Sequence, residues 1–333
     1  MSQVSPVAFV EATLAYQKTA AIRAAIGFDL FTIINAGDDT IDALAAKIGA
    51  SKRGLRILCD FLTVHGFLEK SGDRYASTPS SRTFLDRKSP AYMGSIVEFH
   101  AAPEMCSLFL SDPMSFVRDG GTVGLGSVAP DHPLWSIFAE AMAPVMTPLA
   151  ATVAKQIAGW EAPPRKVLDV AAGHGVFGIA IAKAIAGAEV TALDWPGILD
   201  IAKCNADAAG VGASFRGLPG SAFDVDWGTG YDLVLLANFL HHFDEPTCIS
   251  LLKKTRASLG PGGKAVVIEF VPNEDRISPP FEASFAFYML GSTPGGDAFT
   301  AAELAAMAQA AGFKNAVTKP LPRSAQSLTV FEQ

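Results

Sequence analysis

One stretch of the chain restricts its fold more than any other, the segment at residues 166–196 with the sequence KVLDVAAGHGVFGIAIAKAIAGAEVTALDWP. It reads in order as a short apolar strand, a turn with glycines, a helix, a second strand and an acidic residue, Asp194. This order is typical of a βαβ unit that binds a nucleotide-shaped cofactor at the carboxyl ends of parallel strands. The turn, however, carries alanines where a dinucleotide-binding turn carries glycines.

The same alternation continues towards the end of the chain. Apolar runs predict strands at residues 166–171, 189–193, 232–236 and 264–270, and helical spacing predicts helices at residues 175–186, 197–209, 246–259 and 301–311. Short strands that alternate with helices predict an α/β fold with a Rossmann-like, doubly wound, mostly parallel sheet. The last two stretches, KNAVTKPLP and SLTVFEQ, are expected to add an antiparallel hairpin.

The part of the chain before the paired prolines of GWEAPPR has a different pattern. Apolar positions recur at helical spacing over residues 5–60, Thr40 and Ser51 can cap short helices, and Gly49 can end one. Two short strands around residues 71–73 complete the order of a winged helix. We therefore expect a mostly α winged-helix domain at residues 1–100, linker helices at 101–162, and a cofactor-binding domain at 163–333.

Composition narrows the class of protein. With 333 residues and a net charge of −7, the chain is long enough for two domains and too acidic to have nucleic acid as its main partner. No uninterrupted apolar run is long enough to span a bilayer, and the first residues do not resemble a secretory signal. The four cysteines fit neither a disulfide framework nor a metal site, so we expect free buried thiols in a reducing cytoplasm: Cys59, Cys106, Cys204 and Cys248.

The turn LDVAAGHG indicates which cofactor is bound. Asp169 comes just before Gly173 and Gly175, where its charge would repel a pyrophosphate and favour a cationic ligand. Asp194 follows Gly175 by 19 residues (194 − 175), the place of an acid that binds ribose hydroxyls. An adenosine with a cationic end and no phosphate meets both requirements, so we expect S-adenosylmethionine. The alternative is an ordinary strand-to-helix turn that serves packing alone.

The segment LVLLANFLHHFDEPTC places two histidines directly after the strand expected at residues 232–236, at the edge where ligands bind. A histidine there can take a proton from a hydroxyl near neutral pH. Glu269 ends the next strand and can fix the imidazole tautomer from the same edge. Adjacent residues that leave a strand point in different directions, so only one imidazole is expected to face a substrate. The alternatives are histidines buried as satisfied polar groups, and a Glu269 that is salt-bridged or solvated.

With these motifs the chain resembles the class I S-adenosylmethionine-dependent O-methyltransferases of the caffeic acid and acetylserotonin type. LDVAAGHG resembles their first cofactor motif, HHFDEPTC resembles their segment around the catalytic histidine, and TAAELAAMAQAAGF resembles a helix near the end of their catalytic domain. The resemblance covers nearly the whole chain and implies a winged-helix dimerisation domain and a homodimer. It implies that His241 is the catalytic base and Glu269 the first catalytic glutamate, whereas the second glutamate falls on Ala301.

The resemblance also implies which residues contact the cofactor. Ser221 and Ala237 stand where the family usually has an adenine-binding aspartate and a lysine, and Phe243 replaces a tryptophan. Adenine would then be held partly by backbone and apolar contacts. No metal is implied. The implied cofactor-binding residues are Asp169, Ala171, Gly173, Gly175, Asp194, Trp195, Ser221, Ala222, Phe223, Ala237 and Asn238.

An apolar face in the stretch HPLWSIFAEAMAPVM marks the expected acceptor site. Leu134, Phe138, Met142 and Met146 recur every four residues, a spacing that also fits a core helix. In the resembling enzymes this helix closes the acceptor pocket, and flat aromatic acceptors suit such a lining. A partner chain would add Phe9 or Tyr16. The implied acceptor-binding residues are Leu134, Phe138, Met142, His242, Phe287, Met289 and Leu290.

These features favour methyl transfer from S-adenosylmethionine to a hydroxyl, expected to be phenolic, of a small aromatic metabolite. Two alternatives stay open. One is methyl transfer to carbon, or another reaction on the same scaffold. The other is a ligand-sensing regulator in which Lys52, Arg53 and Arg56 contact DNA. The pairing of His241 with Glu269 and the negative net charge of the chain disfavour the regulator. Neither nucleic acid nor a membrane is therefore expected as a partner.

Overall fold

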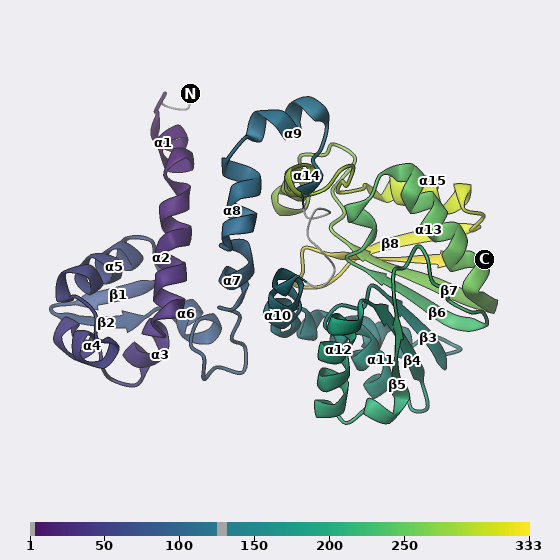
Figure 1. The fold of residues 1–333 in the computed structure, drawn as a ribbon, viewed down its shortest axis with the longest axis horizontal. Coiled ribbons are helices and arrows are strands. Elements are labelled where there is room, and N and C mark those ends of the chain that lie inside the picture. The colour runs from purple at the N-terminus through teal and green to yellow at the C-terminus, as the bar shows by residue number, and fades with distance from the viewer. Residues whose placement is uncertain (1–3, 125–131) are drawn as a thin grey trace. The chain divides into compact units, whose positions relative to one another are not determined.

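The computed structural model describes residues 4–124 and 132–333. The chain divides after Cys106 into two compact units (Figure 1). The helices that follow Cys106, in the range expected to form a linker, group with the sheet-containing second unit. A bilayer-length helix, α10 (Pro133–Ala158), lies in that unit.

The first unit is mostly helical, and its local structure follows from its capping residues. The Thr40 side chain accepts a hydrogen bond from the Ala43 N–H, and the Ser51 side chain accepts one from the Gly54 N–H. Gly49 ends the first of these helices with a φ of 72°, a conformation that favours glycine. The elements are α1 (Val7–Thr13), α2 (Ala15–Gly27), α3 (Leu30–Asn35), α4 (Ile41–Ile48), α5 (Lys52–Val64), β1 (Leu68–Ser71), β2 (Arg74–Ser77), α6 (Pro79–Phe84) and α7 (Ile96–His100).

Helix α1 buries none of its residues in this unit. Apolar side chains of α1 and the start of α2 are instead exposed: Val7, Phe9, Val10, Leu14 and Tyr16. The core of the unit forms further along the chain, from α2 to β2, around residues such as Leu30, Leu55 and Leu62. The apolar face of α1 is therefore free for another surface to cover.

The basic residues at the start of α5 are mostly paired with acids on the surface. Lys52 lies 2.8 Å from Asp42, and Arg56 lies 3.0 Å from Asp60. Pairs this exposed behave as a solvated charged face.

The second unit is built on a seven-stranded sheet in the order β5-β4-β3-β6-β7-β9-β8. The neighbours from β5 to β7 are parallel, and β9 and β8 add antiparallel strands at one side. The four predicted strands and the closing hairpin are confirmed, whereas β5 was not predicted. The strands are β3 (Lys166–Val170), β4 (Glu189–Asp194), β5 (Phe215–Pro219), β6 (Tyr231–Ala237), β7 (Leu259–Glu269), β8 (Asn315–Pro320) and β9 (Ser327–Glu332).

Helices cover both faces of this sheet, as a doubly wound fold requires (Figure 1). Alternate strand residues serve alternate faces: Leu233 and Leu235 pack with α10, α11 and α12, whereas Val234 and Leu236 pack with α13 and α15. The helices of this part of the chain are α8 (Pro103–Leu110), α9 (Pro113–Asp119), α10, α11 (Val176–Ala184), α12 (Pro196–Ala208), α13 (Glu245–Ser258), α14 (Pro280–Ser292) and α15 (Ala301–Ala310), with 3₁₀ turns η2 (Gly212–Ser214) and η3 (Leu240–His242).

Two sequence expectations need correction here. By length and composition α10 could cross a bilayer, although no such run was expected; its second half packs into the core of the second unit through Ala150, Val153, Ala154 and Ile157. All four cysteines are free, but only Cys59 and Cys248 are buried, and burial raises the pKa of each to about 12. Cys106 is half-buried and Cys204 is exposed because the helices that carry them turn these positions outward.

Candidate active site

Three polar side chains lie at the carboxyl edge of the sheet because their strands are parallel and belong to one sheet. Strand β3 pairs with β4 on one side and with β6 on the other, and β6 pairs with β7. Asp194 ends β4, His241 follows β6 in turn η3, and Glu269 ends β7. Sheet order reverses between β3 and β6, the place where folds of this type bind ligands.

The turn between β3 and α11 is shaped by three residues with positive φ: Ala171 at 52°, Gly173 at 56° and Gly175 at 74°. The two glycines serve different purposes. A Cβ on Gly175 would lie 3.0 Å from the Ala202 Cβ and 3.1 Å from the Phe215 ring, so Gly175 allows the turn to pack on α12 and β5. A Cβ on Gly173 would meet nothing within 4 Å. Gly173 therefore faces open space, where a ligand can approach the backbone.

Asp194 is positioned by the same turn. One carboxylate oxygen accepts the Gly173 N–H at 2.8 Å, and the other accepts the Trp195 N–H at 2.7 Å. Burial raises the pKa of Asp194, and these two hydrogen bonds oppose the shift. Each oxygen keeps a further lone pair, so the carboxylate can accept hydrogen bonds from the two hydroxyls of a ribose. The residues present fit the adenosine part of S-adenosylmethionine.

Asp169 does not offer its charge at this edge as the sequence suggested. Its side chain is 1% exposed and accepts the Gly178 N–H at 3.0 Å, beneath the first turn of α11. Burial raises the pKa of Asp169 to about 7. The carboxylate stabilises the start of α11, because the backbone N–H groups of a helix's first turn lack partners within the helix. The neighbouring His174 is also buried, which lowers its pKa to about 4.

Lys254, which was not predicted from the sequence, holds the loop after β5. This loop is expected to contact adenine. The Lys254 ammonium on α13 donates hydrogen bonds to the carbonyls of Ala222, Phe223 and Val225 at 2.8, 3.1 and 2.8 Å. The Ser221 hydroxyl accepts the Phe223 N–H at 3.1 Å. These bonds fix the loop, while the Phe223 ring stays about half exposed.

The residues after β6 continue this edge. Asn238 follows Ala237 with a φ of 55°, and its side-chain oxygen accepts a hydrogen bond from the Gln326 amide. The Asn238 N–H donates to the Ile268 carbonyl of β7 at 2.8 Å. The chain thereby turns sharply from β6 into η3, which carries the two histidines.

His241 and Glu269 form a buried pair. The His241 Nδ1 lies 2.5 Å from Glu269 Oε2, and the two side chains are 7% and 3% exposed. Glu269 Oε1 accepts three backbone N–H groups, from Phe239 at 3.0 Å, Leu240 at 2.9 Å and His241 at 3.3 Å. A carboxylate held by four donors fixes the imidazole with its proton on Nδ1, which leaves Nε2 to accept a proton.

The two histidines do not point in different directions, contrary to the sequence expectation. Their rings are stacked with centroids 4.3 Å apart and an interplanar angle of 28°. The reason is that they lie in a 3₁₀ turn and not in extended chain. Burial is the main cause that lowers the pKa of His242 to about 3, and its Nδ1 is a buried nitrogen without a hydrogen-bond partner among the described residues. His242 therefore stacks as a neutral ring, and only His241 bonds to Glu269.

An aromatic wall stands beside His241. The Phe285 ring on α14 meets the His241 ring edge to face at 4.9 Å, and Phe270 and Tyr288 extend the wall at 4.2 and 5.8 Å from Phe285. Phe287, which was expected in the acceptor site, is two residues away and so on another side of the helix from Phe285. Its contact with an acceptor stays a prediction. Phe287 contacts Phe116 of α9 and is 55% exposed.

A family model for the O-methyltransferase domain matches residues 110–314, and one for the O-methyltransferase dimerisation domain matches residues 10–87. The first match alone covers more than half of the chain. The chain belongs to the O-methyltransferase family. It is an S-adenosylmethionine-dependent O-methyltransferase with an N-terminal dimerisation domain.

Three known proteins are similar to this O-methyltransferase along most of their length. A solved protein of Nostoc punctiforme PCC 73102, described as a candidate O-methyltransferase, superposes with a TM-score of 0.95 at 43% identity, over 99% of this chain and 100% of that chain. The 3-hydroxy-5-methyl-1-naphthoate 3-O-methyltransferase of Streptomyces sahachiroi is 26% identical over 300 residues, 86% of this chain and 83% of the relative. Human N-acetylserotonin methyltransferase, solved in complex with S-adenosylmethionine, shares the fold with a TM-score of 0.84 at 20% identity, over 100% and 99% of the two chains.

The other acceptor residues expected for this O-methyltransferase lie on α10 and α14. Leu134 and Met289 are buried, and Phe138, Met142 and Leu290 are half-buried. Their contact with an acceptor stays a prediction. Within residues 4–124 and 132–333, no group of three or more histidine, cysteine or acidic side chains is placed to hold a metal ion.

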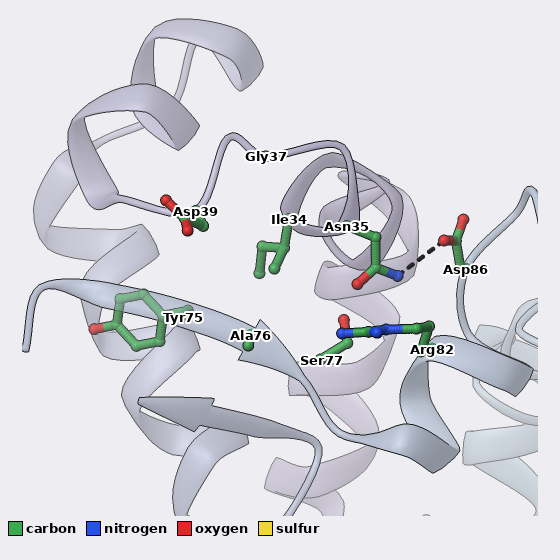
Figure 2. A pocket seen from close by; sticks show the side chains of 9 residues that line it. All are labelled: Ile34, Asn35, Gly37, Asp39, Tyr75, Ala76, Ser77, Arg82 and Asp86. Atoms are coloured by element: carbon green, nitrogen blue, oxygen red, sulfur yellow. Dashed lines mark hydrogen bonds between the residues drawn. The ribbon is translucent and has the colours of Figure 1, made fainter. Parts of the chain in front are cut away.

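A cavity of about 390 Å³ lies elsewhere in the O-methyltransferase, in its first unit (Figure 2). Figure 2 shows Asn35 of α3 bonded to Asp86, with Ser77 of β2 and Arg82 of α6 beside them. None of these residues belongs to the sheet that carries His241 and Glu269. The cavity is therefore separate from the sheet edge that carries the buried pair.

Proposed function

We propose that this O-methyltransferase transfers the methyl group of S-adenosylmethionine to a hydroxyl of a small aromatic metabolite, with His241 as general base. One observation carries the proposal, the 2.5 Å contact between His241 Nδ1 and Glu269 Oε2. It directs the unprotonated Nε2 away from Glu269, and the wall formed by Phe285 adjoins the same ring.

The cofactor site is proposed to lie along the ends of β3, β4 and β6. S-adenosylmethionine, when bound, supplies a methyl group activated by the positive sulfur. Asp194 would accept hydrogen bonds from the ribose hydroxyls, the open backbone at Gly173 would lie along the ligand, and the loop at Ser221–Phe223 would contact adenine. Trp195, Ala237 and Asn238 complete the proposed set.

The chain's own contribution to the reaction is to hold the acceptor and move its proton. His241 Nε2 takes the hydroxyl proton as the new bond to oxygen forms, and Glu269 stabilises the resulting imidazolium. The three N–H groups on Glu269 Oε1 keep the carboxylate from rotating away, so its orientation is fixed before the acceptor binds. A general base of this kind contributes roughly 10²–10⁴-fold to the rate.

An aromatic acceptor is favoured by the surface beside His241. Phe285, Phe270 and Tyr288 offer ring faces and edges, which prefer to pack against another ring. The Streptomyces relative acts, by its name, on a hydroxyl of a naphthoate. Phe138 and Met142 of α10 and His242 would add to the acceptor site.

We also propose a homodimer formed through the N-terminal unit, in the cytoplasm. The apolar face of α1, with Phe9 74% and Val7 56% exposed, is large enough to need a partner surface. The order of α4, α5, β1 and β2 fits a winged helix used for dimerisation, since Lys52 and Arg56 are engaged with acids.

A methylation screen tests the proposed function. The protein is incubated with methyl-labelled S-adenosylmethionine and a panel of hydroxynaphthoates, hydroxyindoles and flavonoids, and products are identified by mass spectrometry. We expect a methyl ether from at least one hydroxylated ring and none from the same ring without its hydroxyl. A product methylated on carbon would overturn the assignment of the hydroxyl, and so would equal labelling of the ring that lacks it.

A further inference from the structure

A loop after α14, Thr293–Asp297, lies against the backbone that carries the two histidines. The Asp297 N–H donates a hydrogen bond to the His241 carbonyl at 3.1 Å. Gly296, the residue before Asp297, also packs closely against the His241 carbonyl. This loop has no part in the pair formed by His241 and Glu269, yet it contacts the same residue from the other side.

Gly296 is present because there is no room for a side chain. A Cβ at this position would lie 2.2 Å from the His241 carbonyl oxygen, 2.5 Å from the Thr293 hydroxyl oxygen and 3.0 Å from the His242 carbonyl carbon. The φ of Gly296 is not in the left-handed region, so the backbone conformation does not require glycine. Since real Cβ atoms essentially never come within 3.0 Å of such a neighbour, a methyl group here would displace the backbones by about 0.8 Å (3.0 − 2.2).

Thr293 ties this loop to α14. Its buried hydroxyl donates to the Met289 carbonyl at 2.8 Å and accepts the Gly296 N–H at 2.8 Å. Helix α14 also carries Phe285, whose ring contacts the His241 ring. The backbone and the ring of His241 are therefore held by two parts of one rigid piece of structure.

The loop also packs against a backbone segment that contains two glycines. A Cβ on Gly121 would lie 2.3 Å from the Pro294 carbonyl oxygen, and one on Gly124 would lie 2.2 Å from the Ser292 carbonyl oxygen. The Thr122 N–H donates to the Thr293 carbonyl at 2.9 Å. The loop thus packs against two stretches of backbone, so any shift of the loop must change these contacts.

We propose that Gly296 and Thr293 are positioning residues, which set the His241 backbone so that Nδ1 meets Glu269. The proposal rests on the proposed role of His241 as the base. The contact between Nδ1 and Glu269 is short, and a displacement near 1 Å is enough to lose such a hydrogen bond.

Nitrogen-15 NMR of histidine-labelled protein with S-adenosylhomocysteine bound tests this directly. The Nδ1 proton of His241, identified as the signal missing from His241→Ala, reports its bond to Glu269. We expect Gly296→Ala to lose this signal or shift it upfield. Gly295→Ala, the matched control, should retain it, because the nearest atom to a Cβ there is the Asp244 Cβ at 3.1 Å, which requires a shift of only a few tenths of an ångström.

A second pair of variants applies even if Gly296→Ala does not fold. Thr293→Val keeps the shape and removes the hydroxyl, and should shift the signal in the same direction; Thr293→Ser should restore it. The proposal would be overturned if Gly296→Ala lowered the melting temperature but left the His241 signal unchanged. If Gly296→Ala does not fold, the same result for Thr293→Val would overturn it. If His241 is not the base, turnover by His241→Ala would stay normal, whereas the NMR signal would still respond to the Gly296 and Thr293 variants. The proposed function and this proposal can therefore fail separately.

Discussion

Replacing Glu269 with glutamine keeps the shape of the side chain and, on this geometry, reverses the hydrogen bond that orients His241. Glutamine can keep its oxygen where Oε1 accepts the three N–H groups of η3. Its amide nitrogen then faces His241 Nδ1 and can only donate. The opposite rotamer would direct two amide hydrogens at three backbone donors and is strongly disfavoured. His241 Nδ1 must therefore become the acceptor, and the proton moves to Nε2.

An imidazole that carries its proton on Nε2 cannot take one from the acceptor. The loss should therefore approach that of removing the base, roughly 10²–10⁴-fold in kcat. A comparable change at a serine hydrolase, aspartate to asparagine behind the histidine, lowers kcat by about 10⁴-fold through the same tautomer reversal. The affinity for S-adenosylhomocysteine should stay within about threefold, because Glu269 lies on β7 and Asp194 lies on β4.

Turnover against pH, measured with an acceptor found in the methylation screen, tests this prediction. Glu332→Gln is the matched control, since it neutralises a glutamate at the end of β9 that pairs with Lys264 on the surface. The Glu269→Gln rate should recover partly at high pH, where the acceptor hydroxyl ionises without a base. Turnover of Glu269→Gln within about threefold of the wild type, with a large loss in His241→Ala, would contradict this tautomer reversal.

Three further predictions follow from the same structure. Asp194→Ala should weaken S-adenosylhomocysteine binding by about 1.5–3 kcal/mol in titration calorimetry, whereas Asp200→Ala, exposed on α12, should not; equal affinities would remove Asp194 from the site. Burial lowers the pKa of His174 to about 4 from its ordinary 6.5, so the folded state loses stability as pH falls through that window. Between pH 7 and pH 5, denaturant unfolding should show about 2 kcal/mol less loss for His174→Gln than for the wild type, and parallel losses would contradict the assignment. Light scattering should give a dimer that Phe9→Glu weakens, and a well-behaved wild-type monomer at micromolar concentration would contradict the role of α1.

The sequence was sufficient for the features set by local pattern. The strands β3, β4, β6 and β7 are apolar runs bounded by turns, so their order and their polar ends could be predicted. Because parallel strands end at one edge, the placement of Asp194, His241 and Glu269 at that edge could be predicted. Strand β5 was missed because its sequence, FRGLP, is half exposed at the edge of the sheet and has no apolar run.

Contacts between residues that are far apart in the sequence could not be predicted from the sequence pattern. Which face of α14 meets His241 depends on how the helix is placed, so the contact of Phe285 with the His241 ring could not be predicted. The stacking of the histidines depends on η3, a turn with no clear signal in the sequence. Lys254 and Gly296 act through backbone groups far away along the chain, which a residue pattern does not reveal.

The most direct test of the central claim is a single-turnover comparison of the wild type with His241→Ala. Enzyme in excess over methyl-labelled S-adenosylmethionine is mixed with a phenolic acceptor, and the methyl ether is quantified over time. We expect His241→Ala to form the same ether roughly 10²–10⁴-fold more slowly with an unchanged affinity for S-adenosylhomocysteine, and His242→Ala to lose far less. Equal rates for the wild type and His241→Ala, or equal losses in the two histidine variants, would contradict the assignment of His241 as the base.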